Sequence, residues 1–153
     1  MTIWIDDDAC PREILEVLLR ASERRGIPLT RIANRALPRH PSALVSSVRV
    51  GAEFDAADRY IAERVAEGDL VVTSDVPLAA AIVARGALGL SPRGEVFNED
   101  NVGGKLATRD LLSELRSAGA ILGGPAALAA GDRRRFADAL DRLLTRLAAR
   151  PPV

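Results

Sequence analysis

Three consecutive carboxylates end the first apolar run of the chain. Residues 3–5 are Ile-Trp-Ile, which indicates a short buried strand, and Asp6, Asp7 and Asp8 follow directly. Carboxylates packed this closely at the end of a buried strand repel one another and resist removal from water. Either a hard divalent cation neutralises such a cluster, or water and the N-terminus of the following helix do so. The first alternative predicts metal-assisted chemistry, and the second predicts a solvated turn.

Three further aspartates lie where they could join this cluster. Asp55 and Asp58 are three residues apart at the start of a predicted helix and therefore share one face, and Asp75 follows a second apolar run. Ligand sites in open α/β sheets lie at the carboxyl ends of strands, so Asp6, Asp8 and Asp75 are expected at one edge of the sheet. Taken singly, Asp55 and Asp75 are better explained as helix N-caps, and Asp58 as a favourable charge in a first helical turn. Taken jointly, Asp6, Asp8 and Asp75 favour a functional site.

The elements that must position these acids alternate between strand and helix. We expect strands at residues 2–6, 28–33, 45–50, 69–74 and 87–90. We expect helices at residues 11–25, 56–67, 77–85, 106–117 and 132–149, and a loop with some helix at 91–104. This order predicts a single α/β domain over residues 1–150, with a short C-terminal tail at 151–153. Its mostly parallel central sheet has about five strands and carries helices on both faces.

The composition of the chain indicates a soluble globular protein and argues against a disulfide-stabilised or membrane-spanning one. Of the 153 residues, 48% are apolar and 27% charged, which is typical of a soluble globular chain. The lone cysteine, Cys10, excludes an internal disulfide and suits a reducing cytoplasm, where we expect the protein to reside. No basic segment followed by an apolar one suggests a signal peptide, and the longest uncharged run, 117–131, is broken by Gly and Pro. We therefore expect no membrane association.

The formal net charge of zero conceals an uneven distribution. Residues 12–49 carry eight arginines against three acids, residues 51–100 carry ten acids against four arginines, and the remainder is again basic. Because arginine binds phosphate as a planar fork, basic flanks around an acidic centre could hold a polyanion over a metal site. Solvated helix faces explain most of these arginines more simply, since a dedicated nucleic-acid binder usually has a clearly basic domain.

Several motifs together resemble the YaiI/YqxD family of uncharacterised bacterial proteins. They are Asp-x-Asp-Ala-Cys-Pro at 6–11, Phe-Asp-x-x-Asp at 54–58, Thr-x-Asp-x-Pro-Leu-Ala at 73–79, Ser-Pro-Arg-Gly at 91–94 and Gly-Gly-Pro-Ala at 123–126. The resemblance covers nearly the whole chain in the right order. That family is grouped with PIN-like domains, many of which are metal-dependent ribonucleases. The resemblance thus implies a PIN-like α/β sandwich with an acidic pocket that binds Mg²⁺ or Mn²⁺, and RNA as a partner.

Carried over by position, Asp6 and Asp75 match the strand-end acids of that family best. Asp8 joins them as a catalytic candidate, and Asp55 and Asp58 complete the expected metal-binding set. Asp7 departs from the family, which usually has a small residue there, and we expect it to point away from the pocket. The implied reaction is phosphodiester hydrolysis without a covalent enzyme intermediate, in which one or two divalent ions activate water.

Five residues are candidate substrate contacts, and two of them, Arg93 and Asn34, also have a simpler structural explanation. Arg35, Arg39 and Arg93 are candidates for phosphate binding, although Arg93 also suits a plain turn. Asn34 follows the second predicted strand and could reach substrate or cap a turn. Thr73 belongs to the Thr-x-Asp motif that ends the fourth predicted strand.

Two other classes of protein stay open. A non-catalytic RNA- or protein-binding module could retain the same acids for folding or metal binding. A haloacid-dehalogenase-like phosphohydrolase would use Asp6 as nucleophile and Asp8 as general acid, but no later acidic pair follows a predicted strand. The only histidine, His40, cannot form a zinc site with one cysteine, and Cys10 is expected to be a small buried residue.

Overall fold

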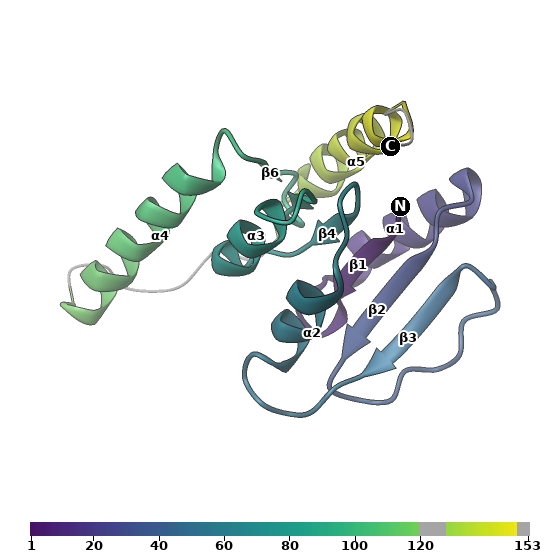
Figure 1. Cartoon of the computed structure of the whole chain (residues 1–153), viewed down its shortest axis with the longest axis horizontal. Coiled ribbons are helices and arrows are strands. Elements are labelled where there is room, and N and C mark those ends of the chain that lie inside the picture. The colour runs from purple at the N-terminus through teal and green to yellow at the C-terminus, as the bar shows by residue number, and fades with distance from the viewer. Residues whose placement is uncertain (120–127, 150–153) are drawn as a thin grey trace.

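The protein is described by a computed structural model that covers residues 1–119 and 128–149 (Figure 1). Its six-stranded sheet has the order β3-β2-β1-β4-β5-β6, and every neighbouring pair is parallel except the antiparallel pair β5–β6. The strands are β1 (Ile3–Asp6), β2 (Leu29–Ala33), β3 (Val45–Arg49), β4 (Leu70–Val72), β5 (Leu88–Leu90) and β6 (Val96–Phe97). The predicted α/β class with a mostly parallel sheet is confirmed. The Gly-Gly-Pro-Ala motif at 123–126 and the predicted tail lie outside the described residues.

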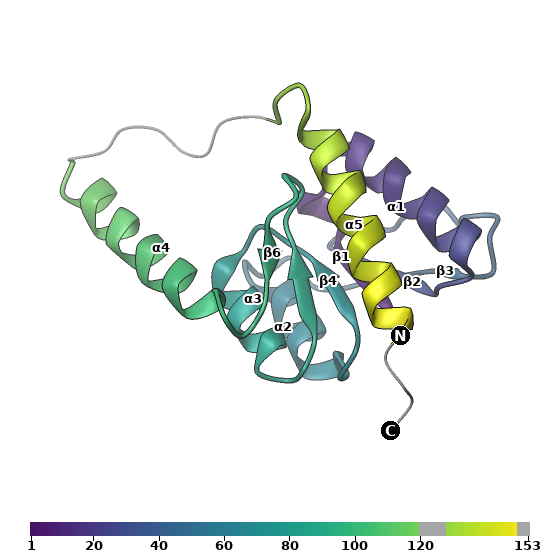
Figure 2. The ribbon, with the colours of Figure 1, turned by 90° about the horizontal axis from the view of Figure 1, so that it is seen from above.

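Helices cover both faces of the sheet, as Figure 2 shows from above. The helical elements of the described residues are the 3₁₀ turn η1 (Asp7–Ala9) and the helices α1 (Arg12–Arg25), α2 (Ala56–Arg64), α3 (Val76–Val83), α4 (Val102–Ser117) and α5 (Asp132–Ala148). One core joins α1 and α5 to Ile3 and Ile5 of β1, and a second joins α2 and α3 to Val71 of β4. Because both faces are buried, the central strands are continuous apolar runs without alternating polar residues.

The sequence reasoning missed β6 and misplaced the start of α4. β6 lies within the segment predicted as a loop, because a strand of two residues leaves no periodic pattern. Gly94, with a φ of 89°, allows the tight turn that returns the chain from β5. α4 begins at Val102 and includes Gly103 and Gly104, which lie at the end of the segment expected to be a loop with some helix, because glycine disfavours helix interiors.

α4 stands apart from the sandwich. It packs against α3, has no fully buried residue, and extends away from the sheet in both views (Figures 1 and 2). Among the described residues, no helix combines the length and the apolar character that crossing a bilayer would need.

The strand order contains one reversal that matters for function. From β1 the chain proceeds to β2 and β3 on one side, and from β4 to β5 and β6 on the other. The carboxyl ends of β1 and β4 therefore flank the point where the order reverses. Open α/β sheets bind ligands at this place, because the connecting loops diverge and leave a crevice.

Candidate acidic site

Three aspartates meet at the reversal of strand order, and we call Asp6, Asp58 and Asp75 the acidic cluster. Asp6 is the last residue of β1, Asp75 precedes α3 just after β4, and Asp58 lies in the first turn of α2. Burial, followed by the charges of Asp8 and Asp75, raises the pKa of Asp6 above its usual value, against the opposing effect of the Ala9 and Asp8 backbone N–H groups. Burial and then the Asp75 and Asp6 charges raise the pKa of Asp58 to about 6. The three carboxylates therefore repel one another across a partly dehydrated space.

A hollow of about 180 Å³ opens beside the cluster. Asp6 and Asp58 line it together with Asp8, Asn34 and the loop between β3 and α2. Phe54 comes from this loop, also lines the hollow, and is fully exposed to solvent. The hollow thus combines carboxylates, an amide and an uncovered aromatic ring.

Asp75 serves the fold as well as the cluster. Its Oδ1 accepts a hydrogen bond from the Leu78 N–H at 2.8 Å, which caps the N-terminus of α3. The Asp75 N–H donates to Thr73 Oγ1 at 3.0 Å, and Thr73 is buried. Thr73 therefore positions Asp75, and it is not among the residues that line the hollow.

The carboxylates of Asp7 and Asp8 already have partners: both pair with arginine side chains, and Asp8 also accepts a backbone hydrogen bond. Asp7 is buried and accepts from Arg31 Nε at 2.7 Å and from Arg35 at 3.3 Å. Asp8 lines the hollow, but its Oδ2 accepts the Asn34 backbone N–H at 2.7 Å and its Oδ1 lies 3.3 Å from Arg35 Nε. Arg35, predicted as a phosphate contact, is thus held beside the hollow by two acids. Asp7 does not line the hollow.

Asp55 does not cap α2 through its side chain. It has φ −112° and ψ 16°, away from the extended conformation usual at an N-cap, and accepts no capping hydrogen bond. Its carboxylate lies 3.3 Å from Arg59 Nε on the helix surface, and its charge adds to the raised pKa of Asp58. The N-cap interpretation is therefore wrong for Asp55, although it holds for Asp75.

The two other predicted phosphate contacts lie away from the hollow. Arg39 is exposed in the loop between β2 and β3. Arg93 lines a separate hollow of about 380 Å³. The structure therefore brings Asp6, Asp8, Asp58, Asp75 and Asn34 together, and leaves Arg39 and Arg93 outside that group.

Sequence reasoning did not single out Phe54. Phe54 belongs to the Phe-Asp-x-x-Asp motif, but the exposure of an aromatic ring cannot be read from sequence. Within residues 1–119 and 128–149, no three histidine, cysteine or acidic side chains are grouped as metal ligands. Cys10 is half-buried, and burial followed by the Asp7 charge raises the pKa of its thiol to about 12.

Comparisons with known proteins point to one family. The model of a family described as "Uncharacterized BCR, YaiI/YqxD family" matches residues 4–146. A UPF0178 protein of Geobacter sulfurreducens is 58% identical over 151 residues, covering 98% of this chain and 100% of the relative. A UPF0178 protein of Trichlorobacter lovleyi is 56% identical over 147 residues, which are 96% of each chain. No solved structure is significantly similar.

Proposed function

The chain belongs to the YaiI/YqxD family, and we propose that it is a metal-dependent nuclease that hydrolyses RNA phosphodiesters at the acidic cluster. The observation that carries this proposal is the meeting of Asp6, Asp58 and Asp75 where the strand order reverses. Two of the three have raised pKa values, so the metal-free protein keeps these charges together at a cost in stability. A bound cation would remove that cost. Perturbed carboxyl groups in a cleft are typical of functional sites.

The donor set suits Mg²⁺ or Mn²⁺. All candidate ligands are carboxylate oxygens, which hard divalent ions prefer over nitrogen or sulfur. Asp6, Asp58 and Asp75 would hold the ion, whereas Asp8 and Asp55 are paired with Arg35 and Arg59. The three side chains do not stand in a ligand geometry, so we expect them to rotate on binding. Magnesium often takes only one or two carboxylates and keeps its waters.

The bound ion would offset negative charge on the scissile phosphate and favour ionisation of the attacking water. The protein's own groups would position the strand. Asn34 lines the hollow beside the cluster, where its side-chain amide can donate to a phosphate oxygen. Arg35 lies next to it and is half-exposed.

The exposed ring of Phe54 favours a single-stranded nucleic acid as the substrate. A fully exposed phenylalanine at the rim of an acidic hollow has no packing role within the described residues. Stacking of a nucleobase on an aromatic side chain contributes about 1–3 kcal/mol of binding and requires no particular base. A base of an unpaired strand could therefore cover the ring while the adjacent phosphate faces Asp6 and Asp58.

A non-catalytic RNA-binding module is the second candidate, and one observation favours it. Asp75 caps α3 and Asp8 binds the Asn34 N–H, so both acids have structural partners. A protein that retains these acids only for folding would bind RNA without cleaving it.

Cleavage of labelled RNA by the purified protein separates the two candidates. We expect a single-stranded oligonucleotide to be cut in Mn²⁺ and to stay intact in EDTA. The Asp6→Asn variant should cut about 100-fold more slowly, because a carboxylate needed for charge stabilisation is lost. Asp138→Asn removes an exposed acid on α5 and is the matched control, with wild-type activity expected. Binding without metal-dependent cleavage, or cleavage that survives Asp6→Asn, would contradict the nuclease proposal.

A further inference from the structure

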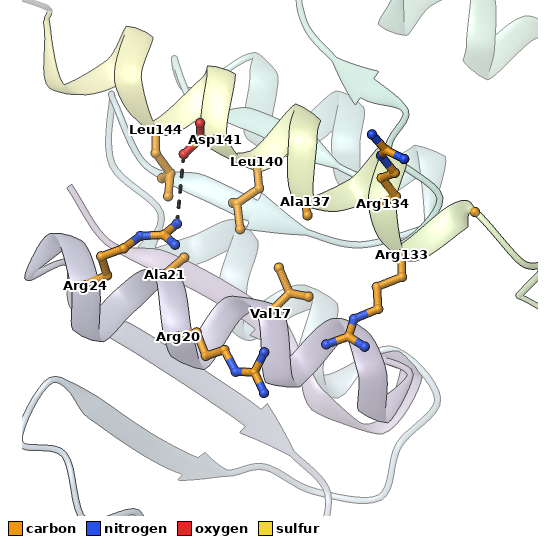
Figure 3. A pocket seen from close by; sticks show the side chains of 11 residues that line it. Val17, Arg20, Ala21, Arg24, Arg133, Arg134, Ala137, Leu140, Asp141 and Leu144 are labelled. Carbon is orange, nitrogen blue, oxygen red and sulfur yellow. Dashed lines mark ion pairs between the residues drawn. The ribbon is translucent and has the colours of Figure 1, made fainter.

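A second concave surface lies between α1 and α5, and we call it the α1–α5 groove. It measures about 470 Å³ and lies over the face of the sheet opposite to α2 and α3 (Figure 3). Its apolar lining comes from both helices: Val17, Ala21, Ala137, Leu140 and Leu144. Four arginines and one acid supply its polar lining: Arg20, Arg24, Arg133, Arg134 and Asp141.

The single acid of the groove is already neutralised. Asp141 Oδ1 is paired with Arg25 and lies 3.9 Å from Arg24. The side chains of Arg20, Arg133 and Arg134 are exposed and form no ion pair within the described part of the chain. Three of the four arginines that line the groove therefore have no ion-pair partner among the described residues.

These three charges have no evident structural purpose. Like charges that face a shared groove repel one another and weaken the folded state. In Figure 3 the Arg133 side chain crosses from α5 toward α1, where its guanidinium group ends on the same side of α1 as that of Arg20, whereas the Arg134 side chain points away from α1. An anion placed there would be contacted by guanidinium groups from two helices at once.

The shape and chemistry of the groove restrict the class of ligand that it could bind. Arginine binds phosphate through two parallel hydrogen bonds, and arginines spread along both rims suit an anion that repeats along a polymer. The apolar floor suits the sugar and base faces of such a polymer, which a purely ionic ligand would leave uncovered. We infer that the α1–α5 groove binds the backbone of single-stranded RNA, with Arg20 and Arg133 as phosphate contacts. The choice of RNA over an acidic peptide rests on the proposed function.

Salt-dependent binding tests this inference without requiring catalysis. The probe is a fluorescent oligouridylate titrated in EDTA with the full-length protein, followed by anisotropy at several salt concentrations. Each phosphate contact to a single strand adds about 0.7 to the slope of log affinity against log salt. R20Q/R133Q should therefore lower that slope by about 1.4 and weaken binding about 25-fold at 0.1 M salt.

The matched control is R85Q/R116Q, which removes the same charge from two exposed positions, one just after α3 and one in the last turn of α4. We expect it to bind within about twofold of the wild type, because these arginines do not line the groove. All four sites are exposed, and circular dichroism of each variant verifies that the fold is retained.

Three results would overturn the inference. One is a wild-type protein that does not bind the oligonucleotide, and another is a groove variant that loses no more affinity than the control. The third is displacement of RNA by polyglutamate of equal charge, which would identify the groove as a site for acidic peptides. Binding is measured in EDTA, where no metal-dependent cleavage occurs, so failure of the nuclease proposal and failure of this inference are distinguishable.

Discussion

Replacing Asp58 by Asn should stabilise the metal-free protein at neutral pH. The folded state raises the pKa of Asp58 from 3.8 to about 6, through burial first and then the charges of Asp75 and Asp6. A raised carboxyl pKa means that the folded state disfavours the ionised form. The contribution of Asp58 to the free energy of unfolding is therefore most favourable below pH 3.8, and it is lost as the pH rises through 6. Asparagine has nearly the same shape and carries no charge to be disfavoured.

The expected gain follows from the size of the pKa change. A shift from 3.8 to about 6 corresponds to about 3 kcal/mol for a fully buried carboxyl group. Because the Asp58 side chain is only half-buried, solvent screening reduces this to about 1 kcal/mol. The gain should be fully present at pH 8 and should fall to a small fraction at pH 4, where most Asp58 carboxyl groups are protonated in the folded state.

Urea denaturation in EDTA at pH 8 and pH 4 measures the effect, with Asp138→Asn as the control. The control removes an exposed acid on α5 and should change the free energy of unfolding by less than about 0.5 kcal/mol at either pH. The reasoning is refuted if Asp58→Asn destabilises the protein at pH 8. It is also refuted if the gain is the same at both pH values, because repulsion between carboxylates must vanish on protonation.

Three further predictions concern other residues near the carboxyl edge of the sheet. Asp7→Ala should lower the free energy of unfolding by about 3 kcal/mol, because it leaves the partly buried Arg31 guanidinium without its partner; a urea midpoint close to the wild type would contradict this. Asp75→Ala should be less stable than Asp75→Asn by about 1 kcal/mol in the same assay, since asparagine can still accept the Leu78 N–H; equal stabilities would argue against the cap. The Cys10 thiol, with its pKa raised to about 12, should be alkylated slowly by iodoacetamide at pH 8 and quickly in urea; fast labelling of the folded protein would contradict its burial.

The strands and helices that carry the acidic cluster could be predicted because local sequence patterns specify them. The apolar runs that form β1 and β4 are short, uninterrupted and followed by acids, and a proline lies next to the first residue of the helix that follows each. The rule that strand ends meet at one edge then brings Asp6 and Asp75 together without knowledge of the strand order. The order itself, β3-β2-β1-β4-β5-β6, explains why the crevice lies between these two strands.

Other features of the site depend on tertiary contacts that sequence does not contain. The partner of Asp7 is Arg31 because β2 lies parallel to β1 with Ile5 opposite Arg31, and no local pattern specifies that register. Asp55 has the residue type of an N-cap, but its backbone conformation places the carboxylate toward Arg59. The exposure of Phe54 likewise depends on how the loop between β3 and α2 leaves the sheet.

Calorimetric titration of the metal-free protein with Mn²⁺ tests the central claim most directly. The proposal predicts binding at millimolar or lower concentration, with a higher melting temperature because the metal binds only the folded state. Binding should be weaker at pH 5.5 than at pH 7.5, since Asp58, with a pKa of about 6, must lose its proton, and it should be absent in Asp6→Asn. A flat titration at pH 7.5 together with an unchanged melting temperature would contradict the assignment of the acidic cluster as a metal site.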